Sequence, residues 1–170
     1  MIKESIVKAL SDQANAEYYS AYLYLAMSAY ADRAGYKGIA NWLFIQAKEE
    51  IAHGSHIYGH ILERGAVPLF ADIKVPETSF NSIKEVFEKV LNHERHVTSL
   101  IDKIATLAEE EKDHATYNFI MWYVNEQIEE EATAGDILAK INLTNSHPGL
   151  LFSLDAEFGT RVCNDPFAGD

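Results

Sequence analysis

Apolar residues recur along this chain at the three- and four-residue intervals of a buried helical face. Glycines end two of these runs, at Gly35 and Gly65, and Ser82 with Glu85 forms a capping box at the start of another. The pattern predicts four long amphipathic helices followed by one short helix. Their approximate bounds are residues 3–33, 39–64, 82–110, 114–143 and 150–160.

The connections between the runs predict how the helices are arranged. Two connections are short turns, so each joins antiparallel neighbours, whereas segment 65–81 is long and contains Pro68 and Pro76. An extended segment of this length reaches ~56 Å, and the second helix is only ~39 Å long. We therefore expect an all-α four-helix bundle in one domain, residues 1–170, with a crossover between parallel helices two and three and a tail at 161–170.

The composition excludes several classes of protein. The 26 acidic and 14 basic residues give a net charge of −12, which disfavours binding to nucleic acids or anionic membranes and is compatible with attracting cations. We recognise no signal peptide and no apolar stretch long enough to span a bilayer. Cys163 is the single cysteine, so neither an internal disulfide nor a four-cysteine metal module can form. We expect a soluble, cytoplasmic protein.

Each of the four long runs carries an acidic residue on its apolar stripe, at Glu17, Glu50, Glu94 and Glu130. A carboxylate in a buried position is costly unless a partner compensates its charge. His53 follows Glu50 by three residues, so both side chains lie on one side of the helix and could share a partner. Gln127 precedes Glu130 at the same spacing.

The spacing of these residues repeats in the two halves of the chain. Thirty-three residues separate Glu17 from Glu50, and the same number separates Glu94 from Gln127. In each half another polar residue follows three positions later, which gives a period of 77 residues. A single acidic residue on an apolar stripe is usually a solvated residue at the edge of that stripe. Solvation does not so easily account for four acidic residues in register.

Two hairpins with this spacing place all of these groups in one layer of the core. The groups lie 14 to 19 residues from the turn of their hairpin, which at ~1.5 Å per residue is nearly one level. Carboxylates packed together without cations repel and take up protons. Two metal ions between them would remove this conflict, and oxygen ligands with one imidazole suit iron or manganese. This layout is already known from four-helix di-iron carboxylate proteins.

The sequence resembles bacterial non-haem ferritins over nearly its whole length. The segments that carry the resemblance are Asn15–Ser20 (NAEYYS), Glu49–His53 (EEIAH), His93–Glu94 and Trp122–Glu131 (WYVNEQIEEE). The resemblance implies a first iron site at Glu17, Glu50 and His53, and a second at Glu50 as the bridge, Glu94 and Glu130, with Gln127 nearby. It implies a third, inner iron site at Glu49, Glu126, Glu129 and Glu130, and it matches Tyr24 to the family's tyrosine beside the paired site.

The function implied by the resemblance is iron storage with ferroxidase activity. Fe(II) would be oxidised by O2 or peroxide at the paired site and stored as a ferric oxyhydroxide mineral. The chain would be one of 24 identical subunits of a hollow cage, with the short fifth helix lining the four-fold axes.

Two departures from related families are informative. Haem-containing bacterioferritins have a second Glu-x-x-His where this chain has Gln127-x-x-Glu130, and Ile51 stands in place of their haem-ligating Met, so we expect no haem. Rubrerythrins need an iron–cysteine module that a single cysteine cannot supply.

Two alternatives stay open: a di-iron or di-manganese oxidase or catalase that stores nothing, and a metal-free helical interaction bundle. We expect His56 and His60 to be surface or interface residues. His93 and His96 flank Glu94 and point away from its stripe, so we expect both to be exposed.

Overall fold

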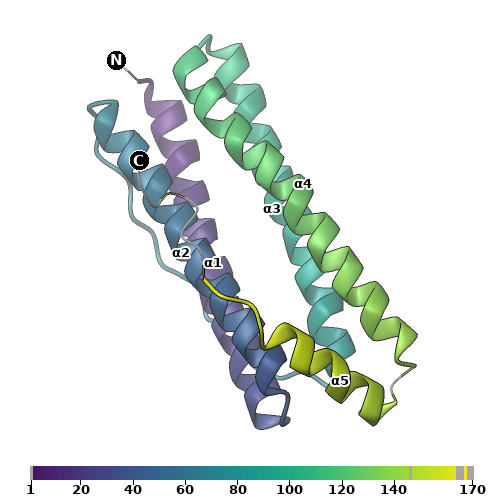
Figure 1. The fold of residues 1–170 in the computed structure, drawn as a ribbon. Helices are drawn as coiled ribbons and strands as arrows, with labels where there is room; N and C mark the ends of the chain where they lie inside the picture. The colour runs from purple at the N-terminus through teal and green to yellow at the C-terminus, as the bar shows by residue number, and fades with distance from the viewer. Residues whose placement is uncertain (1, 146, 164–166, 168–170) are drawn as a thin grey trace.

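The computed structural model describes residues 2–145, 147–163 and 167, which form five helices and, within these ranges, no strand (Figure 1). In this part of the chain, no helix is both long enough and apolar enough to span a membrane. The helices are α1 Glu4–Arg33, α2 Lys37–Glu63, α3 Ile83–Glu110, α4 His114–Leu143 and α5 Pro148–Phe158.

The four long helices form two antiparallel hairpins, α1–α2 and α3–α4, and the segment after α2 crosses the length of the bundle (Figure 1). Arg64, just beyond α2, forms an ion pair with Asp113 in the α3–α4 turn at 3.0 Å. Lys3, just before α1, pairs with Glu111 in the same turn. The α3–α4 turn therefore lies where α2 ends, so α2 and α3 run parallel. The predicted all-α bundle with a crossover is confirmed.

Left-handed residues follow the four long helices. Gly35 and Gly65 have φ angles of 92° and 75°, which glycine adopts without steric cost. Lys112 and Asn145 reach φ angles of 55° and 47° after α3 and α4. The glycine signals therefore located two helix ends in the sequence, while the other two ends use side-chain-bearing residues.

The predicted capping box at the start of α3 is present with one change. The Ser82 hydroxyl accepts a hydrogen bond from the Glu85 backbone N–H at 3.1 Å. The Glu85 carboxylate, however, accepts from the backbone N–H of Asn81 at 2.7 Å rather than from that of Ser82. The cap therefore fixes the last residues of the crossover as well as the helix start.

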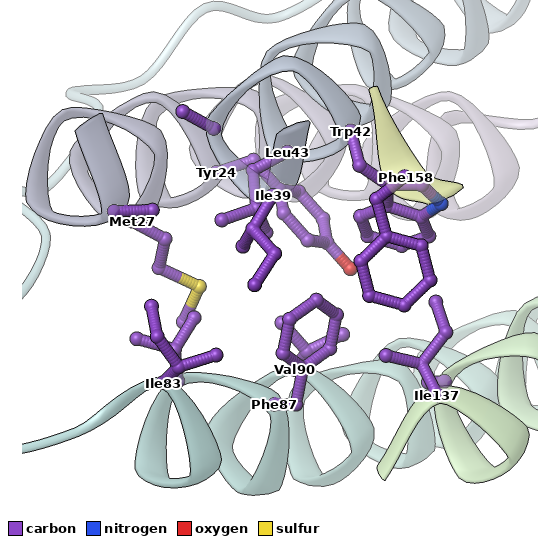
Figure 2. Packing of buried hydrophobic residues seen from close by; sticks show 14 of the residues in the cluster. Tyr24, Met27, Ile39, Trp42, Leu43, Ile83, Phe87, Val90, Ile137 and Phe158 are labelled. Atoms are coloured by element: carbon purple, nitrogen blue, oxygen red, sulfur yellow. The ribbon is translucent and has the colours of Figure 1, made fainter. Parts of the chain in front are cut away.

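The three- and four-residue spacing predicts eight inner positions on each of α3 and α4, and all of them are buried. They are Ile83, Phe87, Val90, Glu94, Val97, Ile101, Ile104 and Ala108 on α3, and Thr116, Ile120, Tyr123, Gln127, Glu130, Ala134, Ile137 and Ile141 on α4. Two apolar clusters fill the bundle, one at each end of the long helices. Figure 2 shows the cluster nearer α5, in which residues of α1 and α2 face residues of α3. Its buried aromatic members are Tyr24, Trp42, Phe80, Phe87 and Phe158. The polar residues of the stripes lie between the two clusters.

Helix α5, predicted at about 150–160, closes the end of the bundle where α2 begins. Leu154 and Phe158 are buried, and the Asp155 carboxylate accepts a hydrogen bond from the Ile39 backbone N–H at 2.8 Å. A Cβ atom on Gly38 would lie 1.7 Å from the Asp155 carbonyl oxygen. Only glycine at this position allows α5 to approach α2 so closely.

We expect Gly38→Ala to displace α5 and to destabilise the chain by about 1–3 kcal/mol, because a backbone atom must move to admit the methyl group. The measurement is the thermal unfolding midpoint. Gly59→Ala, in the same helix, is the matched control, since its Cβ would meet nothing within 4 Å. The control should keep or slightly raise the midpoint, because alanine is the better helix former. Equal midpoints in the two variants would contradict this account of α5.

Candidate metal centre

A layer of polar side chains separates the two apolar clusters, and all four long helices contribute to it. Every residue predicted for the paired site is buried, with at most 9% of its surface exposed. These residues are Glu17 on α1, Glu50 and His53 on α2, Glu94 on α3, and Gln127 and Glu130 on α4.

Glu17, Glu50 and His53 meet at the α1–α2 side of this layer. Each offers one ligand atom, and the three atoms lie within 4.8 Å of one another. The His53 Nδ1 atom is 3.5 Å from a Glu50 carboxylate oxygen, close to the separation of two ligands that share one ion at about 2.1 Å each. Tyr123 donates a hydrogen bond to the His53 backbone carbonyl at 2.8 Å, and its ring lies 6.0 Å from the imidazole. This donor set fits a divalent metal ion.

Glu94 and Glu130 form the other side of the layer. The Tyr24 hydroxyl and the Gln127 side-chain amide both donate hydrogen bonds to the Glu94 carboxylate, the second at 3.2 Å. Gln46 donates to Glu130 at 2.8 Å and to Glu50 at 3.0 Å. The Gln46 amide therefore joins the two sides, and Glu50 lies between them.

Burial and mutual repulsion change the pKa values of these carboxyl groups. Burial, followed by the charge of Glu50, raises the pKa of Glu17 and that of Glu94 to about 8. Burial, with the charges of Glu50 and Glu94, raises the pKa of Glu130 well above its ordinary value. In the absence of metal, these three groups hold protons near neutral pH.

Glu50 and His53 behave in the opposite way because they form an ion pair. Burial opposes the charged form of Glu50, but hydrogen bonds from His53 and Gln46 bring its pKa below the ordinary value. Burial also opposes the charge on His53, yet the bond to Glu50 and the surrounding carboxylates raise its pKa to about 10. The metal-free layer thus keeps one positive and one negative group side by side.

Comparison with known proteins agrees with this geometry. A family model described as a ferritin-like domain matches residues 7–144. The chain belongs to the ferritin family. A bacterial non-heme ferritin from Staphylococcus aureus is 37% identical over 165 residues, 97% of this chain and 99% of that protein. A protein of Haemophilus influenzae described as a bacterial non-heme ferritin-like protein is 39% identical over 159 residues, 94% and 96% of the two chains.

Solved structures of ferritins superpose closely on this chain. An open pore ferritin from the hyperthermophilic archaeon Archaeoglobus fulgidus is 42% identical, with a TM-score of 0.94 that covers 95% of this chain and all of the other. A closed form engineered from the same ferritin gives a TM-score of 0.95 at 42% identity, covering 96% of this chain and all of the other. The ferritin fold therefore extends over almost the whole chain.

Two glutamines that hold the ferritin layer were not singled out in the sequence. Gln13 donates to the Glu17 carboxylate at 2.8 Å, and Gln46 makes the equivalent bond to Glu50. Each glutamine precedes its glutamate by four residues, one helical turn, and the two glutamines are themselves 33 residues apart. The repeated spacing that marked the carboxylates would have identified these partners as well.

The four carboxylates predicted for the third site differ in exposure. Glu130 is buried within the paired layer, Glu49 and Glu126 are partly buried, and Glu129 is exposed. Burial raises the pKa of Glu49 and that of Glu126, and the charge of Glu126 acts on Glu49. The Glu49 carboxylate accepts a hydrogen bond from Arg161 in the segment after α5, a partner that the sequence analysis did not identify.

One sequence expectation about the histidines was wrong. His93, expected to be exposed, is partly buried, and its Nε2 atom lies 2.7 Å from the Ser20 hydroxyl. Its ring also lies 6.4 Å from that of Tyr24. Ser20 and Tyr24 of α1 cover this position although it lies beside the stripe. His96 is exposed as expected.

The raised pKa values predict how the stability of the metal-free protein depends on pH. A carboxyl group with a folded pKa of about 8 keeps its proton in the folded state but loses it near pH 4.5 when unfolded. Its contribution to stability therefore falls as the pH rises from its unfolded pKa through 8. His53 acts in the same direction, because its pKa rises on folding to about 10.

We expect the unfolding free energy of the metal-free protein to decrease from about pH 6 to about pH 9, by up to ~1.4 kcal/mol per pH unit for each such group. Denaturant unfolding at several pH values measures it. The double variant Glu17→Gln/Glu94→Gln should show a smaller slope, because its amides cannot ionise. Identical pH profiles for the two proteins would contradict the assignment of the protonated carboxyl groups.

Proposed function

We propose that this chain is an iron-storage ferritin with ferroxidase activity. The observation that carries the proposal is the buried layer in which Glu17, Glu50 and His53 bring their ligand atoms within 4.8 Å of one another. The second group, Glu94 and Glu130, is tied to the first through Gln46. Its membership of the ferritin family supports the assignment of iron rather than another metal.

Fe(II) is the substrate in this proposal. The first ion binds to Glu17, Glu50 and His53, and the second to Glu50, Glu94 and Glu130, with Glu50 as the bridge. Binding requires ionised carboxylates and a neutral imidazole. The carboxyl protons of Glu17, Glu94 and Glu130 and the imidazolium proton of His53 are therefore released when iron enters.

Oxidation then takes one electron from each Fe(II). O2 accepts the two electrons with two protons and becomes hydrogen peroxide; with peroxide as the oxidant, the same electrons and protons cleave its O–O bond to give two waters. The apolar clusters on both sides keep bulk water out of the layer. Tyr24, bonded to Glu94, keeps its hydroxyl proton because burial and the nearby carboxylates raise its pKa well above the ordinary value.

Storage follows from transfer of the ferric product out of the layer. Glu49, Glu126 and Glu129 lie next to the paired site in sequence and extend the carboxylates toward solvent. We assign them, with Glu130, to a third iron site on the path to a mineral-filled cavity. A cage of 24 subunits belongs to the same proposal, supported by the likeness to solved ferritins. A cytoplasmic location is part of the proposal as well.

A di-iron or di-manganese oxidase that stores nothing would use the same ligands. The two functions differ in the fate of iron, so the protein is loaded aerobically with a large excess of Fe(II) and separated by size. A ferritin elutes as a large assembly that carries far more iron than its binding sites can hold. A small oligomer that leaves the added iron to precipitate would exclude storage.

We expect Glu50→Ala and His53→Ala to slow the initial oxidation of Fe(II) by at least tenfold, because the first removes the bridge and the second the only imidazole of the paired site. Stopped-flow absorbance after mixing anaerobic Fe(II)-loaded protein with O2 measures the rate.

Glu110→Ala and His96→Ala are matched controls, because they remove the same residue types from exposed positions of α3. Both controls should oxidise iron at the wild-type rate. Wild-type kinetics in both Glu50→Ala and His53→Ala would exclude ferroxidase activity at this layer.

A further inference from the structure

Arg161 lies beyond α5, in a segment that turns back along α2 (Figure 1). Its guanidinium donates hydrogen bonds to the Glu49 carboxylate, to the Gln46 side-chain oxygen at 2.9 Å and to the Trp42 carbonyl at 3.4 Å. It also stacks on the Trp42 ring, 4.5 Å from the ring centre. The Asn41 side chain holds the Arg161 carbonyl at 3.1 Å. Hydrogen bonds and ring stacking therefore hold the Arg161 side chain in one position.

The pair between Arg161 and Glu49 is largely shielded from water. The arginine side chain is 24% exposed and the glutamate side chain 16%. In the ion pair of Lys140 with Glu157, by contrast, the two side chains are 50% and 56% exposed. Solvent and salt screen a shielded pair less, so the guanidinium strongly influences any other cation that approaches Glu49.

Gln46 connects Arg161 to the paired site. A guanidinium has only donors, so Gln46 must turn its oxygen toward Arg161. Its amide nitrogen then faces the paired site, where it donates to Glu50 at 3.0 Å and to Glu130 at 2.8 Å. Arg161 thus lies beside the two iron positions without touching any of their ligands.

Glu49 cannot serve Arg161 and a metal ion equally well. An ion bound to this carboxylate would lie within a few ångström of the guanidinium, where two positive charges repel. We propose that Arg161 is a built-in cation that occupies the Glu49 position of the third metal site, so that a third ion binds only when the guanidinium leaves this carboxylate. The inference rests on the proposed function, because Glu49 is a metal ligand only there.

Two consequences follow for metal binding. The paired site fills before the third site, because within the part of the chain that the structure describes none of its ligands is bonded to a positive side chain from outside the layer. Filling of the third site moves the guanidinium away from Glu49 and changes its contact with the Trp42 ring. The segment after α5 thereby responds to how much metal the subunit carries.

The test is a calorimetric titration of the assembled, metal-free protein with Zn²⁺, which binds without redox chemistry. Wild type should bind two ions per chain tightly and a third more weakly. Arg161→Gln removes the charge but keeps a polar side chain, and should bind the third ion at least tenfold more tightly with the first two unchanged. Arg161→Lys, which keeps the charge, should leave the third ion weakly bound.

Lys140→Gln is the matched control, because it removes a cation that is paired with Glu157 of α5 but is distant from Glu49 in the chain. It should titrate like wild type. Trp42 gives a second readout once Trp122, whose ring lies 5.5 Å from that of His53, is replaced by Phe. In this background the tryptophan emission should change with the third equivalent of Zn²⁺, and after Arg161→Gln it should not.

The outcomes separate this inference from the function on which it rests. If Arg161→Gln binds two ions per chain tightly but binds the third no more tightly than wild type does, the role of Arg161 is overturned and the paired site stands. Failure of every variant, and of wild type, to bind two ions tightly would overturn both.

Discussion

The arrangement of this protein depends on one electrostatic constraint, the placement of four carboxylates in a dry layer of a helical bundle. Such groups cannot all be ionised at close range unless cations lie between them. The metal-free layer meets the constraint by keeping one ion pair, Glu50 with His53, and by protonating the other three carboxyl groups. In the proposed function, metal ions would meet it differently, by replacing the protons. Metal binding and proton release from the carboxyl groups would therefore be coupled.

The rest of the fold holds these carboxylates at fixed positions, as a preformed metal site would require. The apolar clusters above and below the layer set the depth of each helix, and Gln13, Gln46, Gln127 and Tyr24 hold the carboxylate oxygens. The crossover makes α2 and α3 parallel, so the two hairpins face each other with equivalent residues at the same level. Helix α5 closes one end and returns the chain to α2, where Arg161 reaches Glu49. The bundle thus positions the carboxylates, while the segment after α5 supplies the positive charge beside Glu49.

The sequence predicted the bundle and the buried layer because both follow from periodic features. The eight positions expected on the inner face of α4 are the eight that are buried, since helical geometry alone determines them. No periodic pattern predicts the contact between Arg161 and Glu49. The two residues are 112 positions apart in the sequence, and they meet only because the segment after α5 returns to α2. His93 was misjudged for a related reason, since its burial depends on how α1 and α3 pack and not on its place in the stripe. Gln13 and Gln46 were accessible to the same reasoning as the carboxylates.

The central claim is that two ions bind in one layer and share Glu50. Anomalous diffraction from crystals soaked anaerobically with Fe(II) measures this directly. The account predicts two iron peaks per subunit inside the bundle, one among Glu17, Glu50 and His53 and one among Glu50, Glu94 and Glu130, with Glu50 touching both. Iron found only at surface carboxylates, or a single interior peak that Glu50 does not contact, would contradict it.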